Sequence, residues 1–265
     1  MDDQSEIIAI GAIPFIIDRD RRLLQQFNKW ENIIRFDHLK KEEGYYAAKL
    51  YKSGINLSTE WPDFGKHYDQ ILNVIIPAPI LDEHGSLTED FKQDLNRLSH
   101  DKEWGFYLAD KDTALRLSGK LPHIDLAGTD FTIDWRLKEL RETEEPWKNI
   151  SLRDMEMSDS GEEYLCFYNT ETHELYEPDE NLLELPENVV VLEIPCEAKL
   201  DPVAVAREYG IGETDLLNDH PFQMNLKAKV TPLSETGLPE YIQNNKRLAA
   251  GNSLNNETQS HKRGR

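Results

Sequence analysis

Four residues that could bind a metal ion lie close together near the middle of the chain: His123, Asp125, Asp130 and Asp134. His123 and Asp125 are two residues apart, so in a strand their side chains point to one face. Imidazole and carboxylate groups bind Zn²⁺, Mg²⁺ or Mn²⁺, and such a set would suit a metal-dependent hydrolase. The same residues also fit a loop that enters a strand. The sequence favours that structural interpretation, with no bound cofactor, and the metal-dependent hydrolase is the alternative.

Two tryptophans, Trp30 and Trp147, each lie in an otherwise polar stretch. A large apolar side chain in a polar loop is expected to pack onto the neighbouring sheet, so the sequence favours two buried anchors. The alternative is a pair of aromatic contact points for a ligand or a protein partner.

Motifs with a defined chemistry are absent from the sequence. The chain contains no GxxxxGK[ST], GxGxxG, HExxH or GxSxG pattern. Its two cysteines, Cys166 and Cys196, have no CxxC spacing and lie in apolar runs, which predicts buried free thiols. The sequence therefore favours a protein that is not an enzyme.

The chain contains an internal repeat, which positions the candidate histidine, aspartates and tryptophans. In this repeat, Ile8–Tyr51 aligns with Ile124–Tyr168. A shift of 116 pairs Ile8, Phe15, Ile17, Asp18 and Leu24 with Ile124, Phe131, Ile133, Asp134 and Leu140. One inserted residue near Pro146 then pairs Trp30, Asn32, Ile33, Asp37, Gly44 and Tyr51 with Trp147, Asn149, Ile150, Asp154, Gly161 and Tyr168. Each copy is expected to be a β-hairpin, a loop and a third strand, with Asp18 and Asp134 forming turns.

The apolar run from Ile7 to Ile17 is expected to be one strand in the first copy. Its counterpart from Ile124 to Leu137 is expected to be one strand in the second copy. Val189 to Ile194 is a further β-branched strand. A helix is expected from Thr88 to Leu98. Another is expected from Asp201 to Gly210, because Asp201 suits the N-cap and Gly210 suits the position after the helix. The predicted fold class is α+β and β-rich, with a duplicated hairpin, loop and strand unit and few short helices.

The predicted organisation divides the chain into five parts. Residues 1–60 are the first repeat unit, 61–120 a connecting α/β segment and 121–180 the second repeat unit. Residues 181–243 form a C-terminal strand–helix–strand segment, and 244–265 form a disordered basic tail.

The chain is strongly acidic, with a net charge of −20. Residues 244–265 carry +4, which leaves −24 for the rest. A surface of that sign repels nucleic acid phosphates and anionic lipid, so no nucleic acid partner is expected except through the tail, and no membrane partner is expected. An acidic N-terminal stretch also lacks the positive charge of a signal peptide, which predicts a cytoplasmic location.

The leading hypothesis is a non-enzymatic, intracellular protein-binding or regulatory protein with an acidic surface. A second alternative, beside the hydrolase, is an acidic DNA mimic that inhibits a nucleic acid enzyme, although the acids here are dispersed and mixed with bases. The segment from Leu185 to Gly210 resembles uncharacterised bacterial proteins, and this resemblance implies no activity and no residue role.

Overall fold

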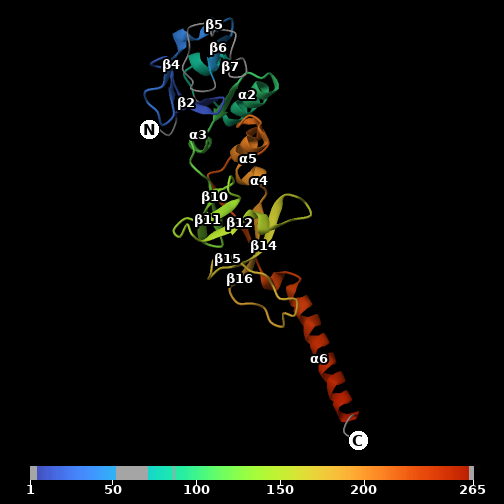
Figure 1. The fold of residues 1–265 in the computed structure, drawn as a ribbon. Coiled ribbons are helices and arrows are strands. Elements are labelled where there is room, and N and C mark those ends of the chain that lie inside the picture. The colour runs from blue at the N-terminus through green and yellow to red at the C-terminus, as the bar shows by residue number, and fades with distance from the viewer. Residues whose placement is uncertain (1–4, 52–70, 86, 263–265) are drawn as a thin grey trace. The chain divides into compact units, whose positions relative to one another are not determined.

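The chain folds into two compact units. The computed structural model describes residues 5–51, 71–85 and 87–262, with side chains described up to residue 250 except that of Tyr51. Unit 1 contains Met1–Pro122 and Glu197–Met224, and unit 2 contains His123–Cys196 and Asn225–Arg265 (Figure 1). Several sheets accompany the helices, which confirms the predicted α+β, β-rich class.

Unit 1 is built on a five-stranded antiparallel sheet in the order β4-β3-β2-β1-β8. Its strands are β1 (Ile7–Ile10), β2 (Ile13–Asp18), β3 (Leu23–Gln26), β4 (Ile33–Arg35) and β8 (Phe106–Ala109). Because β1 to β4 run alternately up and down, the β1–β2 and β3–β4 turns lie at the same end of this sheet. A smaller antiparallel sheet contains β5 (Lys40–Glu42), β6 (Tyr45–Tyr51) and β7 (Ile71–Pro77).

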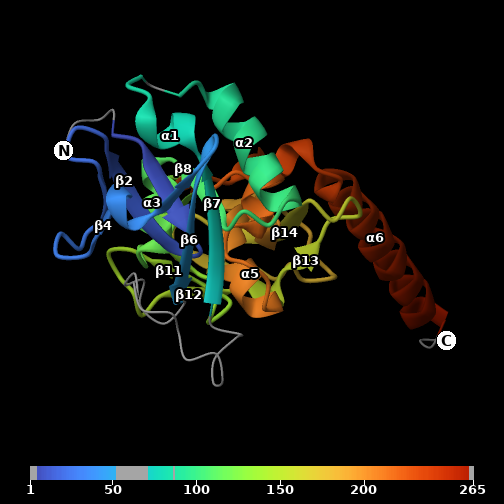
Figure 2. The ribbon, with the colours of Figure 1, turned by 90° about the horizontal axis from the view of Figure 1, so that it is seen from above.

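The helices of unit 1 cover both faces of the five-stranded sheet. They are α1 (Ala78–Asp82), α2 (Glu89–Asp101), α3 (Lys111–Leu117), α4 (Glu197–Leu200) and α5 (Pro202–Tyr209). Helix α2 packs along β8 (Figure 2). The side chain of Thr88 caps α2, and Asp201 caps α5, which ends at Gly210 in the left-handed conformation (φ 69°). Both predicted helices are confirmed.

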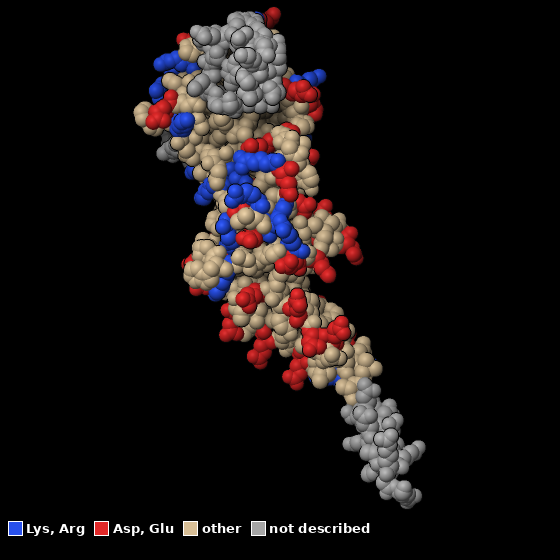
Figure 3. Space-filling model, in the orientation of Figure 1, with Lys and Arg blue, Asp and Glu red and all other residues tan. Residues whose placement is uncertain are grey.

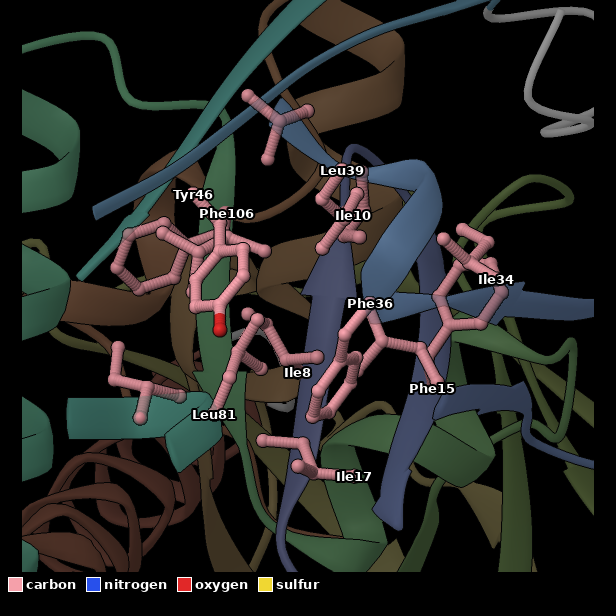
Figure 4. Packing of buried hydrophobic residues seen from close by; sticks show 14 of the residues in the cluster. Ile8, Ile10, Phe15, Ile17, Ile34, Phe36, Leu39, Tyr46, Leu81 and Phe106 are labelled. Carbon is pink, nitrogen blue, oxygen red and sulfur yellow. The ribbon is translucent and has the colours of Figure 1, made fainter. Parts of the chain in front are cut away.

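Successive residues along the strands of the five-stranded sheet pack into different apolar clusters. Ile8, Phe15 and Ile17 face a large apolar cluster that also contains Phe36 and Tyr46 (Figure 4). The opposite face carries Ile7 and Ala9, which belong to smaller clusters with residues of α3 and of the 197–224 segment. Strand β1 is therefore buried on both faces, as its four consecutive buried residues show.

This double burial explains one wrong prediction. The run from Ile7 to Ile17 is not one strand but two, β1 and β2, joined by a turn at Gly11 with a φ of 58°. The equivalent run of unit 2 turns at Ala127 and Gly128, both with positive φ. In unit 1 both faces of β1 are buried, so no polar residue interrupts the apolar pattern to mark the turn. In unit 2, β9 is buried at alternate residues, so its turn is not explained in this way.

A buried ion pair holds the 197–224 segment in unit 1. Arg116 on α3 is 3 % exposed, and Asp201 has no exposed surface. Arg116 Nε donates to Asp201 Oδ1 and Oδ2 over 2.9 and 3.0 Å, and Arg116 Nη2 donates to Oδ2 over 2.8 Å. Asp201 Oδ1 also accepts from the Ala204 N–H (3.1 Å), so one carboxylate both caps α5 and binds α3.

Unit 2 is built on a five-stranded sheet in the order β12-β11-β10-β9-β17 and a second sheet in the order β13-β14-β16-β18, with β15 paired to β14. The strands are β9 (His123–Leu126), β10 (Thr129–Asp134), β11 (Glu139–Glu142), β12 (Asn149–Ser151), β13 (Glu156–Met157), β14 (Glu163–Asn169), β15 (Glu174–Leu175), β16 (Val189–Pro195), β17 (Asn225–Lys227) and β18 (Lys229–Pro232). Strand β17 pairs with β9 in parallel, whereas β8 pairs with β1 antiparallel.

The two aligned segments form the same series of strands. Strands β1, β2 and β3 lie 116 residues before β9, β10 and β11, whereas β6 and β7 lie 118 residues before β14 and β16. The insertion is thus two residues in the β13–β14 turn, not one residue near Pro146. Burial fixes this register, because Ile34 (1 % exposed) matches Ile150 (3 %), whereas Ile33 is 38 % exposed.

The C-terminal region differs from its prediction. Helix α6 (Leu238–Lys262) continues through most of the segment that was predicted to be a disordered tail. It is held to unit 2 near its start, where Tyr241 Oη donates to the Glu180 carbonyl (2.8 Å) and Asn245 Nδ2 donates to the carbonyls of Glu180 and Leu182. Composition indicated low apolar content, but Lys246 to Ala250 are good helix formers that extend an anchored helix.

One segment of unit 2 is strongly acidic. Residues 171–187 of unit 2 contain seven acids and no Lys or Arg, and all seven are exposed. They surround β15 and the chain that leads to β16, where acidic residues gather in the space-filling view (Figure 3). Among the described residues, no helix is long and apolar enough to cross a membrane.

The surroundings of Asp82, at the end of α1, predict that the stability of the fold depends on pH. Tyr46 Oη and Lys41 Nζ donate to its carboxylate over 2.6 and 2.9 Å. Partial burial opposes ionisation, but these hydrogen bonds outweigh it and lower the pKa of Asp82 below 3.8. A lowered folded-state pKa stabilises the fold above pH 3.8, and this stabilisation is lost as the pH falls through the folded-state pKa.

We therefore expect Asp82→Asn to lower the urea midpoint at pH 7 and to have progressively less effect below about pH 4. The control is Asp20→Asn, since the Asp20 side chain is 91 % exposed and should contribute little. Urea titrations of the three proteins between pH 3 and pH 7 measure the effect. A difference between wild type and Asp82→Asn that stays constant over this range would contradict the assignment.

Candidate protein-binding site

Trp30 lies in a turn whose backbone is closed by hydrogen bonds. The turn connects β3 to β4, and the Gln26 N–H donates to the Asn32 carbonyl (2.8 Å) across its base. Inside it, the Asn32 N–H donates to the Lys29 carbonyl (3.1 Å), which makes residues 29–32 a β-turn with Trp30 at the second position. The Asn32 side chain also donates to Gln26 Oε1 (2.8 Å). Trp30 is 74 % exposed on this closed turn.

Trp147 lies in the equivalent turn of unit 2. The turn connects β11 to β12, and the Glu142 N–H donates to the Lys148 carbonyl (3.0 Å). The Lys148 N–H donates to the Glu145 carbonyl (2.8 Å), so residues 145–148 are also a β-turn, with Trp147 at the third position. Pro146 fixes the φ angle at the second position. Trp147 is 73 % exposed.

The prediction that these tryptophans are buried anchors is therefore wrong. In unit 1 the loop is anchored by Phe27, which is 5 % exposed and packs with Ile7, Ala109 and Ala114. In unit 2 the matching position is Thr143, which donates to Asp130 through both its backbone N–H (2.9 Å) and Oγ1 (2.6 Å). Since another residue already holds each loop, the tryptophan side chains remain at the surface.

The four residues of the predicted metal site are only partly brought together. His123 Nδ1 lies 2.9 Å from Asp130 Oδ2 on the neighbouring strand. Asp125 instead accepts from the Gly128 N–H (2.6 Å) and pairs with Lys227 at 3.4 Å. Asp134 pairs with Arg141 (2.5 Å).

Within the described parts of the chain, no three His, Cys, Asp or Glu side chains are arranged to hold a metal ion. The hydrolase alternative therefore has no set of ligands among these residues. Asp125 and Asp134 instead hold the ends of their strands, as acids near turns often do.

The structure shows a polar network that the sequence did not indicate. His173 Nδ1 lies 3.0 Å from Glu142 Oε2, and His173 Nε2 lies 3.3 Å from Thr129 Oγ1. Glu142 is 6 % exposed. The imidazole thus joins the β14–β15 turn to β10 and β11, and satisfies a carboxylate that would be costly to bury alone. Its members lie up to 44 residues apart in the sequence, so spacing alone could not reveal it.

The cysteines are free, as predicted, with Cys196 buried and Cys166 half-buried. Burial raises the pKa of the Cys166 thiol to about 12. Its thiol is therefore protonated at neutral pH and is a poor nucleophile, because the thiolate is the reactive form.

Unit 1 also contains an open cleft of about 680 Å³ that sequence analysis did not predict. It is lined by the β1–β2 turn, Leu72 of β7, residues 96–107 from the end of α2 to the start of β8, and residues 211–218. These four segments lie far apart along the chain, so no local motif marks the cleft.

Comparison with known proteins finds no protein-family model, curated protein or solved structure that matches this chain.

Proposed function

We propose that the protein is a non-enzymatic protein-binding protein in which each unit presents one exposed tryptophan to a partner. The observation that carries this proposal is the exposure of Trp30 and Trp147, 74 and 73 %, on equivalent closed turns. A tryptophan left in water forgoes the large stabilisation that its burial would provide. Tryptophan is also among the residues most enriched at energetic hot spots of protein interfaces.

The rigidity of the turns supports the same proposal. Hydrogen bonds fix the backbone on both sides of each tryptophan, and Pro146 restricts the second turn further. A preorganised contact loses less conformational entropy on binding than a flexible one. These two turns therefore suit recognition better than an open loop with the same residue would.

The charge of the protein favours a basic partner. The seven exposed acids of residues 171–187 form a surface that attracts cationic groups. Electrostatic complementarity of this kind raises the rate of association and disfavours acidic competitors.

The test is affinity capture from lysate of the source cells with wild type, Trp30→Ala, Trp147→Ala and the double variant. Tyr209→Ala is the matched control, because Tyr209 is 70 % exposed in unit 1 but is not on either turn. We expect at least one protein to be retained by wild type and by the control and lost with the double variant. With that partner purified, calorimetry should show that replacing a contacting tryptophan weakens binding by about 30-fold or more.

Stability measurements separate binding from folding. Because both side chains are largely exposed, each Trp→Ala change should alter the free energy of unfolding by less than about 0.5 kcal/mol. If the double variant retained the same partners as wild type with the same affinity, the tryptophans would not be the binding residues and the proposal would fail.

A further inference from the structure

The cleft of unit 1 lies at the same end of the main sheet as the Trp30 turn. Gly11 and Ala12 of the β1–β2 turn line the cleft, and Trp30 is on the β3–β4 turn. Strands β1 and β3 are separated only by β2, so the two turns are about 10 Å apart at the strand spacing of a sheet. A partner that covers Trp30 would therefore also reach the cleft.

Part of the cleft lining is apolar. It includes Ile10 and Ile13 of the first hairpin, Leu72 of β7 and Phe106 of β8. Two polar residues that line the cleft have their hydrogen-bonding groups occupied by backbone. Asn96 is paired with the Leu108 N–H (2.6 Å) and carbonyl (3.0 Å), and Ser99 donates to the Phe106 carbonyl (2.5 Å). This part of the lining therefore suits an aliphatic stem rather than a polar group.

Among the described residues that line the cleft, no lysine or arginine balances the carboxylate side chains. Glu103, Glu213 and Asp215 line it, and none of the described lining residues is Lys or Arg. Glu213 is already paired with Arg207 (2.6 Å). Asp215 Oδ2 accepts from the Gly212 N–H (2.8 Å), whereas Oδ1 lies 3.8 Å from His100 Nδ1, too far for a hydrogen bond. Asp215 Oδ1 therefore has an ion-pair partner only when His100 is protonated, and Glu103 has no ion pair with a described residue, so both carboxylates can contact a cationic ligand.

We infer that this cleft binds the side chain of a lysine or arginine residue of the protein partner, an inference that rests on the proposed function. Such a side chain combines an apolar stem with a cationic end, which matches a lining of apolar and acidic side chains. The volume of about 680 Å³ falls within the range of about 300–1,000 Å³ that is usual for small-ligand sites, so it admits one side chain with its flanking backbone.

Small probes test the cleft without the partner. We would titrate the full chain with N-acetylarginine amide and N-acetyllysine amide and follow the amide NMR signals of Gly11, Gly105 and Gly212, which line the cleft. N-acetylnorleucine amide has a similar stem without the charge. We expect saturable shifts with at least one cationic probe, and binding at least about fivefold weaker for the norleucine probe. No saturable shift with either cationic probe would overturn the inference.

Charge-removing variants locate the site. Glu103→Gln with Asp215→Asn should weaken the cationic probe by about fivefold or more and leave the norleucine probe unchanged. The matched control is Asp20→Asn, an exposed acid of unit 1 that does not line the cleft. Equal probe affinity for wild type and the double acid variant would overturn the inference.

The two proposals fail separately. The Trp30→Ala, Trp147→Ala double variant should bind the cationic probe like wild type, since neither tryptophan lines the cleft. Loss of the partner with the tryptophan variants together with no probe binding would leave the proposed function standing and remove the cleft from it. If the probe bound but the tryptophan variants captured the same partner as wild type, the cleft would stand as a binding site and the tryptophans would not be the binding residues.

Discussion

Arg116→Met is expected to lower the free energy of unfolding of unit 1 by about 3–5 kcal/mol, because it leaves the carboxylate of Asp201 buried without its cation. Asp201 has no exposed surface and would keep the hydrogen bond from the Ala204 N–H, with Arg207 as a nearby cation that does not donate to it. An isolated buried charge of this kind is among the most costly defects in a protein interior. Urea unfolding followed by circular dichroism measures the loss.

Hydrogen exchange shows where Arg116→Met destabilises unit 1. The pair joins α3 to the N-terminus of α5, so hydrogen exchange should accelerate first in peptides that cover these two helices. Lys229→Met is the control, because Lys229 pairs with Glu193 in unit 2 but is 71 % exposed, and its loss should cost less than about 1 kcal/mol. A loss below 1 kcal/mol for Arg116→Met would show that the carboxylate finds another partner or is reached by water.

The double variant Arg116→Met with Asp201→Asn shows whether the lost stability comes from the missing ion pair or from the buried, unpaired charge of Asp201. Asparagine can still accept the Ala204 N–H and cap α5. If the cost of Arg116→Met comes from the buried carboxylate, removing that charge as well should recover part of the stability. A double variant less stable than either single variant would contradict this explanation.

The sequence predicted those parts of the fold that depend on neighbouring residues. Asp201, Pro202 and Gly210 define the two ends of α5 because caps act within a few residues of a helix terminus. The same holds for the first half of the repeat, where identical apolar residues occupy equivalent strand positions. The second half was misaligned by one residue because identities alone did not locate the two-residue insertion in a turn.

What the sequence could not predict depends on distant residues. Phe27 and not Trp30 packs into the apolar cluster beside this loop, and no local pattern distinguishes the two aromatic residues. Arg116 and Asp201 are 85 residues apart, and the cleft combines four separate segments. The sequence named Trp30 and Trp147 as alternative contact points, but their exposure, the ion pair and the cleft depend on tertiary packing and became visible only in three dimensions.

A second large effect is expected from the matched core substitutions Phe15→Ala and Phe131→Ala. Both phenylalanines are fully buried at equivalent positions of the two main sheets. Removing a buried phenylalanine ring costs about 3–5 kcal/mol, from lost burial and from the cavity left behind. Phe131 also contacts the ring of Tyr168 edge-on, with centroids 6.5 Å apart, so its loss additionally removes an aromatic pair. Phe91→Ala is the control, since Phe91 is 43 % exposed on α2.

The spatial spread of each defect tests whether the two units are separate folding units. Each has its own apolar core, and a unit with its own core can unfold by itself. We therefore expect Phe15→Ala to accelerate hydrogen exchange in β1 to β4 while β9 to β12 keep their protection, and Phe131→Ala to do the opposite. Because residues 197–224 belong to unit 1, peptides from α5 should follow Phe15→Ala although they come after unit 2 in the sequence. Acceleration of α5 together with β9 to β12 in Phe131→Ala would instead assign that segment to unit 2 in folding, and the buried Arg116–Asp201 pair would then not be what holds it.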